Sequence, residues 1–193
     1  MQQRKLLVPL SKILADSRYQ LRVRGHDEEH VEALAVAYRD REQMPPVKLA
    51  LVGEDYLIIG GSHRVEAARR ADLVEIAAVV VDVPDEATGL QLAAADNKAH
   101  GLKMSREDRN AAIVRMRKAG ISAVQIAEAL GVSDQTVNNV IKSARADGES
   151  MPDKVVGKDG VEKPTQDSAR PPKFGGSKSE STSTQSQDAG GSK

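Results

Sequence analysis

Apolar residues gather in four short runs in the first half of the chain, each bounded by turn-forming residues. Runs of this kind predict β-strands. Pro9 lies in the first run and favours a sheet edge, because proline donates no ladder hydrogen bond. The turn Gly53-Glu54-Asp55 separates the second run from the third and predicts a β-hairpin. The runs are Leu6–Leu14, Val47–Val52, Tyr56–Ile59, which we expect to be a buried strand, and Val74–Val83.

Apolar residues at helical spacing lie between and after these runs. Asp27 is expected to cap a helix that ends near Arg39, because the apolar residues between positions 31 and 38 share one face. A later helix begins at Pro84-Asp85-Glu86 and runs to about Gly101. Residues 1–101 therefore predict a small α/β domain with a mixed sheet, too short for a doubly wound dinucleotide fold.

Residues 102–146 predict a second, all-α unit. The sequence SRED at 105–108 is a capping box, and Gly120 ends the helix that it starts. Ala127, Gly131 and Val137 then have helix-turn-helix spacing, which needs a small residue at the helix crossing, a left-handed turn and an apolar contact between the helices. The expected fold class is α+β: a mixed-sheet domain, a helix-turn-helix domain and a flexible tail at 147–193.

The outer face of the last predicted helix, capped by Ser133, is rich in amides. Asn and Gln pair with adenine in the major groove and Thr contacts either base, so this face suits base reading. Residues 102–146 carry eight Lys and Arg against four Asp and Glu, whereas the whole chain is neutral. We therefore expect double-stranded DNA as the partner, with a trihelical unit that packs against protein as the alternative. The expected base contacts are Gln135, Thr136, Asn138, Asn139 and Lys142, and the expected phosphate contacts are Arg106, Arg109, Lys103, Arg115, Arg117, Lys118 and Arg145.

Composition excludes several kinds of site. The absence of cysteine excludes disulfides, thiolate metal sites and cysteine nucleophiles. His26 and His30 are four residues apart, but Asp27 places His26 outside the helix, so we expect surface histidines rather than a metal pair. The longest apolar run, at 76–81, is too short to cross a membrane, and no signal segment opens the chain. A cytoplasmic, nucleoid-associated protein is expected.

The stretch with the clearest chemistry is the junction where Tyr56–Ile59 runs through Gly60-Gly61 into a helix. Glycines let a ligand approach the backbone, and Ser62 is expected to cap the helix. A helix N-terminus favours an anion, and His63 and Arg64 add donors that suit phosphate. The alternative is a tight strand-to-helix turn without a ligand.

Residues 147–193 are rich in Gly, Ser, Lys and Thr and hold few apolar residues, so most of this tail is expected to remain flexible. Residues 175–193 are of low complexity. Asp159-Gly160 predicts a turn between two short extended runs within 155–164. This element is either a short docking element or an inert turn.

A GGxHR-type turn in an α/β unit followed by a helical DNA-binding unit resembles the ParB family and the ParB/sulfiredoxin superfamily, over about residues 6–145. The resemblance implies a nucleoside triphosphate, CTP or ATP with Mg²⁺. It also implies that Asp96 and Asn97 hold the metal. Ser62, His63 and His100 depart from the residues usual in ParB, and Ser62 replaces the cysteine that sulfiredoxin needs, which excludes that enzyme. The implied nucleotide contacts are Gln20 and Arg22 of a Q-x-R motif, with Gly60, Gly61, Ser62, His63, Arg64 and Asn97.

These features together predict a short ParB-like, sequence-specific DNA-binding protein of a plasmid, a phage or a gene cluster, acting as a regulator or partition-like factor. The nucleotide would close two protomers into a homodimer and change the grip on DNA, with weak CTP or NTP hydrolysis left open. One alternative is a ParB-like nuclease or NTPase that uses His63, Asp96 and a metal. The other is a plain transcriptional regulator whose ligand-free α/β domain serves for dimerisation.

Overall fold

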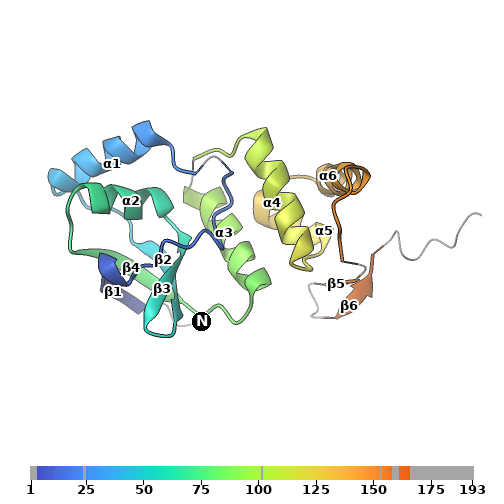
Figure 1. The fold of residues 1–193 in the computed structure, drawn as a ribbon, viewed down its shortest axis with the longest axis horizontal. Helices are drawn as coiled ribbons and strands as arrows, with labels where there is room; N and C mark the ends of the chain where they lie inside the picture. The colour runs from blue at the N-terminus through green and yellow to red at the C-terminus, as the bar shows by residue number, and fades with distance from the viewer. Residues whose placement is uncertain (1–3, 24, 101, 153, 158–160, 166–193) are drawn as a thin grey trace, which may run out of the picture.

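The structure is a computed structural model that describes residues 4–23, 25–100, 102–152, 154–157 and 161–165. Figure 1 shows an α/β part beside a group of three helices, with a small hairpin next to those helices. The α+β class predicted from the sequence is confirmed. Within the described residues, no helix is both long and apolar enough to cross a membrane.

Four strands form one mixed sheet. They are β1 (Arg4–Pro9), β2 (Val47–Val52), β3 (Asp55–Gly60) and β4 (Glu75–Val81). Their order is β1-β4-β2-β3, with β4 and β2 parallel and the other neighbours antiparallel. Pro9 ends an edge strand, as predicted. The strand that leads into the glycine pair was expected to be buried, but β3 is the other edge, and within it only Leu57 and Ile59 are buried.

Helices cover both faces of the sheet. They are α1 (Glu28–Arg39), α2 (Ser62–Arg70) and α3 (Glu86–His100), and a 3₁₀ turn, η1 (Leu10–Lys12), follows β1. Val65 of α2 packs in one cluster with Leu49 of β2, whereas Leu90 of α3 packs in another with Ala50. Consecutive strand residues point to opposite faces, so α2 and α3 lie on opposite sides of the sheet. The predicted cap is confirmed, because the Asp27 side chain accepts from the His30 amide at the start of α1.

The helical unit consists of α4 (Arg106–Lys118), α5 (Ala123–Leu130) and α6 (Asp134–Ala146). Ala127 and Val137 are buried between the helices, and Gly131 has a left-handed φ of +68°. Ser133 caps α6 by accepting from the Thr136 amide. The predicted helix-turn-helix spacing is confirmed, since each of its three residues has the role that the motif requires.

The core runs without a break across the predicted boundary near residue 101. Leu90 and Ala94 of α3 belong to the same buried cluster as Ile113 of α4 and Ile126 of α5. Lys98 of α3 also donates to the Glu128 carbonyl at 3.1 Å. The two predicted units therefore share one core, in which α3 packs against the sheet and against the helices of the second unit.

A hairpin of β5 (Lys154–Val156) and β6 (Glu162–Pro164) follows α6. Both predicted extended runs are present, although the predicted turn residues 159–160 lie outside the described residues. The Val156 amide donates to the Gly120 carbonyl at 2.9 Å, and Val155 is buried. The hairpin thus packs on the link between α4 and α5, in the region where the sequence left either a short docking element or an inert turn open. The low-complexity residues 175–193 lie outside the described residues.

Candidate functional site

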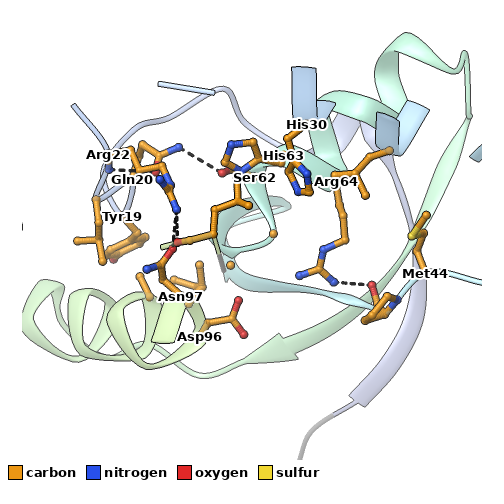
Figure 2. Close-up of a pocket in the computed structure, with 18 residues that line it drawn as sticks. Tyr19, Gln20, Arg22, His30, Met44, Ser62, His63, Arg64, Asp96 and Asn97 are labelled. Carbon is orange, nitrogen blue, oxygen red and sulfur yellow. Dashed lines mark hydrogen bonds between the residues drawn. The ribbon is translucent and has the colours of Figure 1, made fainter. Parts of the chain in front are cut away.

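A cavity of about 270 Å³ lies where the 19–22 loop, the start of α2 and the end of α3 meet. Figure 2 shows side chains from these distant parts of the sequence around the same space. The structure thus brings together every residue implied by the ParB resemblance. The cavity is lined by Gln20, Arg22, Gly60, Gly61, Ser62, His63, Arg64, Asp96 and Asn97, among others.

Gly60 and Gly61 bring bare backbone to this cavity. Gly61 has a φ of +86°, and a Cβ there would lie 2.9 Å from Val47 Cγ1. A Cβ on Gly60 would lie 2.1 Å from Asp96 Oδ2, well inside contact distance. Both positions therefore require glycine, one for its backbone conformation and its surroundings and the other for close packing against α3.

Ser62 does not cap α2, so that prediction is wrong. Gly61 is the N-cap residue and Ser62 is the first helical residue, because the left-handed turn at Gly61 already brings the chain into the helix. The Ser62 hydroxyl instead accepts a hydrogen bond from Gln20 Nε2 at 3.2 Å. The N-cap residue Gly61 has no side chain with which to cap the first amides of α2, which lie beside the cavity at the positive end of the helix dipole.

Arg22 connects the 19–22 loop to α3. Its Nη2 donates to Asn97 Oδ1 at 3.3 Å and also to the Leu102 carbonyl. The Arg22 amide donates to Gln20 Oε1 at 3.3 Å, so the two polar residues of the Q-x-R motif contact each other. The motif places one guanidinium at the cavity wall (Figure 2).

Arg64 turns toward the loop before β2. Its Nη1 donates to the carbonyls of Pro45 at 2.6 Å and Pro46 at 3.0 Å. In Figure 2 the guanidinium points to that wall of the cavity rather than to Arg22. Arg64 therefore fixes the entry to β2 in this structure, in addition to lining the cavity.

Three histidine rings meet beside the start of α2. The rings of His26 and His30 lie 5.2 Å and 5.4 Å from that of His63, and all three residues are partly buried. The expectation of surface histidines at positions 26 and 30 is therefore wrong. His63 Nε2 accepts from the Asp27 amide at 3.1 Å. Burial, followed by the neighbouring His26, Arg22 and His30, lowers the pKa of His63 to about 4, so the ring is neutral at pH 7.

The predicted magnesium ligands are already engaged. Lys48 Nζ lies 2.8 Å from Asp96 Oδ1, and Asn97 Oδ1 accepts from Arg22. Among the described residues, no group of three or more acidic, histidine or cysteine side chains is arranged to hold a metal ion. In this arrangement Asp96 and Asn97 are thus held by Lys48 and Arg22, and a magnesium site at these two residues stays a prediction.

Sequence reasoning missed two residues at the site. Lys48 is the second residue of β2, and its side chain forms an ion pair with Asp96 of α3. The sequence around Lys48 does not distinguish it from a solvent-exposed lysine on a strand. Tyr19 is buried against α3, where a Cβ on Gly89 would lie 2.2 Å from its ring. A glycine inside the predicted helix was the available signal for the second contact, because interior helix glycines often mark close packing.

The α6 face predicted to read bases is largely open to solvent. Gln135, Asn138, Asn139 and Lys142 are exposed, whereas the Thr136 hydroxyl lies 2.9 Å from Ser133 Oγ and is partly covered. Gln135 Nε2 donates to Asn139 Oδ1 at 3.0 Å, which aligns two amides on adjacent turns of the helix.

Two of the predicted phosphate contacts face inward instead. Arg117 is 6% exposed, and its Nη1 donates to the Ile121 carbonyl at 3.3 Å. Arg115 donates to backbone carbonyls of the 17–20 segment. Arg106 at the start of α4 is exposed and Arg109 is partly covered. Helix periodicity alone does not show which basic residues of α4 face the α/β part.

Comparison with known proteins agrees with this fold. Residues 2–97 match the ParB N-terminal domain family, and residues 104–150 match a homeodomain-like domain family. The chain belongs to the ParB-like family. This ParB-like chain is 33% identical over 138 residues to a probable chromosome-partitioning protein ParB of Pseudomonas putida, covering 68% of this chain and 45% of that protein. It spans less than half the length of the curated relatives it matches.

A solved ParB structure shares the fold. The C-terminally truncated ParB of Caulobacter crescentus complexed to the centromeric parS site aligns with a TM-score of 0.50 and 19% identity, over 76% of this chain and 80% of that chain. The same protein complexed with CTP-γ-S aligns with a TM-score of 0.45 and 20% identity, over 75% of this chain and 86% of that chain. The first alignment confirms the mixed sheet and the helical unit as a ParB-type fold.

Proposed function

We propose that this ParB-like protein binds DNA through α6 and binds CTP in the cavity at the start of α2. We further propose that the bound nucleotide changes the affinity of the protein for DNA. The proposal that CTP binds rests on one observation. Arg22, the first amides of α2 and the bare backbone at Gly60-Gly61 converge on the same cavity. Backbone amides at a helix N-terminus and an arginine are the donors that phosphates use in proteins.

The cavity space is consistent with a ligand larger than phosphate. A second cavity, of about 310 Å³, shares Gln20, Gly60 and Ser62 with the first. Each volume is close to the lower end of the range of about 300–1,000 Å³ for small-molecule sites. A nucleoside and its phosphates would occupy both cavities, which share these lining residues.

The DNA half rests on the exposed face of α6. A capped recognition helix with three exposed amide side chains and a lysine suits the major groove, in which Asn and Gln contact adenine. Arg106 and Arg109 at the start of α4 supply phosphate contacts. We infer that the protein acts as a homodimer in a regulatory or partition-like role, with CTP rather than ATP as its nucleotide.

Selection of bound DNA from a random pool, with and without CTP, tests both halves. Wild-type protein should recover one motif, and CTP should change the affinity for it. Arg22→Ala should remove the CTP effect but keep the motif, because Arg22 lies at the nucleotide cavity and not on α6. Arg18→Ala is the matched control, since this arginine of the same loop is half exposed and pairs with the nearby Asp16.

Two results would contradict this proposal, and each would favour a different function. If neither CTP nor ATP binds in equilibrium dialysis, the protein is a DNA-binding regulator with a ligand-free α/β part. The Lys48–Asp96 ion pair favours that alternative over a nucleotide held with a metal, because the carboxylate already has a cation as its partner. If supercoiled plasmid is nicked in Mg²⁺ or Mn²⁺ and Asp96→Ala abolishes the nicking, the protein is a nuclease.

A further inference from the structure

The 15–23 segment, which carries Gln20 and Arg22, has little regular structure of its own. None of the described residues between Ile13 and α1 lies in a helix or strand, so the backbone groups of these residues need other partners. Within the segment, the Gln20 amide donates to the Ser17 carbonyl at 2.9 Å. The Arg18 amide donates to Asp16 Oδ1 at 2.6 Å, and the Arg22 amide donates to Gln20 Oε1 at 3.3 Å. Contacts with other elements add to this local order.

Helix α4 supplies several of those partners through Arg115. Its guanidinium donates to the carbonyls of Ser17 at 3.3 Å, Gln20 at 3.0 Å and Arg18. One side chain therefore satisfies three carbonyls immediately before Arg22. The fork of donors on arginine makes such multiple bonding specific to that residue type.

Asp108, two turns earlier on α4, holds the other end of the segment. Its Oδ1 accepts from the Val23 amide at 2.9 Å, and its Oδ2 accepts from the Ser105 hydroxyl at 2.8 Å. Asp108 is 5% exposed. Burial raises the pKa of Asp108, but the hydrogen bonds from Ser105 and Val23 bring it below its ordinary value. The Asp108 carboxylate is thus ionised and accepts a hydrogen bond from the backbone of the 15–23 segment.

We propose that Arg115 and Asp108 are positioning residues that hold the Gln20–Arg22 part of the nucleotide site on α4, the first helix of the DNA-binding unit. These contacts would couple the nucleotide site to the DNA-binding site. This inference rests on the proposed function. A displacement of α4 would withdraw both anchors and move the Arg22 guanidinium away from Asn97. Because coupling is reciprocal, a nucleotide that fixes the segment would also favour the present position of α4 and so change the affinity for DNA.

The test uses the full chain in four forms: wild type, Arg115→Ala, Asp108→Asn and the control Arg18→Ala. Binding of CTP-γ-S is measured by calorimetry, and binding of a duplex selected on the wild-type protein is measured with and without CTP-γ-S. Arg115→Ala should weaken CTP-γ-S binding by about tenfold or more, because one side chain supplies three hydrogen bonds. DNA affinity without nucleotide should stay within about twofold, and the ratio of DNA affinities with and without nucleotide should approach one.

Two outcomes separate this inference from the proposed function. If wild type binds CTP-γ-S and Arg115→Ala keeps both its nucleotide affinity and its coupling ratio, the inference is overturned. If wild type binds no CTP-γ-S, the proposed function and the coupling both fail. Hydrogen exchange at the Val23 amide then tests whether Arg115 and Asp108 hold the segment. Relative to wild type, exchange should be faster in Arg115→Ala and Asp108→Asn but unchanged in Arg18→Ala. Should Arg115→Ala fail to fold, Arg115→Lys replaces it, since a lysine keeps the charge without the fork.

Discussion

The Lys48 ammonium lies 2.8 Å from the Asp96 carboxylate, and this ion pair joins the sheet to α3 directly behind Gly60. The Asp96 side chain is 7% exposed and that of Lys48 33%. The Asp96 carboxylate therefore lies between a cation and the glycine backbone, and substitutions on either side should disturb the cavity.

Gly60→Ala should destabilise the protein by about 1–3 kcal/mol, the usual cost of overpacking. The added Cβ would lie 2.1 Å from Asp96 Oδ2, and the ion pair with Lys48 keeps that carboxylate from moving away. Urea denaturation measures the loss. The same substitution in an Asp96→Ala background should cost much less, because the clashing oxygen is gone; equal costs in both backgrounds would contradict this packing argument.

Lys48→Met should destabilise the protein by about 1–3 kcal/mol, because it leaves a buried carboxylate without its cation. The Lys48 side chain is one-third exposed, so the cost falls below that of a fully buried pair. Arg39→Met breaks the exposed Glu32–Arg39 pair and is the control, expected to change stability by less than about 1 kcal/mol. A Lys48→Met variant as stable as this control would show that Asp96 is solvated.

Stability should fall as the pH is lowered from about 6.5 to about 4 through the titration of His63. Burial lowers the pKa of folded His63 from 6.5 to about 4, so the unfolded chain binds the extra proton in that window. The loss should be about 1–2 kcal/mol, after discounting for the partial exposure of the ring. Unfolding midpoints at pH 7.5 and pH 5 measure it. His63→Gln should reduce the difference between the two midpoints, and an unchanged difference would assign it to other groups.

Val155→Ala should destabilise the helical unit by about 1 kcal/mol, because Val155 is buried where β5 docks on the α4–α5 link. Val161→Ala in the same hairpin is the matched control, since Val161 is 54% exposed. Thermal unfolding compares the two variants. Equal effects would mean that the docked face of the hairpin contributes nothing to stability.

Asn138→Ala and Arg106→Ala should weaken DNA binding in different ways. The loss of an exposed amide on α6 should cost about 1–3 kcal/mol on the selected motif and little on other sequences. The loss of the exposed arginine at the start of α4 should weaken binding to all sequences and reduce the slope of log affinity against log salt by about one. Fluorescence anisotropy over a salt series separates the two effects. Identical salt slopes and specificities for both variants would contradict the assigned roles.

Local sequence patterns anticipated much of the fold, because strands, helices and caps depend on short-range chemistry. The Asp27 and Ser133 caps and the Ala127, Gly131 and Val137 spacing occur as predicted. The residues implied by the ParB resemblance also line one cavity. At Ser62 the local prediction was wrong, because the left-handed conformation of Gly61 moves the cap back by one residue.

The sequence alone therefore determined the α+β class and the helix-turn-helix, since these depend on periodicity and on short motifs. The resemblance to ParB implied the set of residues around the glycine turn. Only the tertiary structure decided that β3 is an edge strand, that Lys48 pairs with Asp96, and that Arg115 faces the Gln20–Arg22 segment instead of DNA. The physical reason is that Lys48 and Asp96 are 48 positions apart, and Arg115 is 95 to 98 positions from the carbonyls that it contacts. Their geometry depends on how the sheet, α3 and α4 pack, which no local pattern encodes.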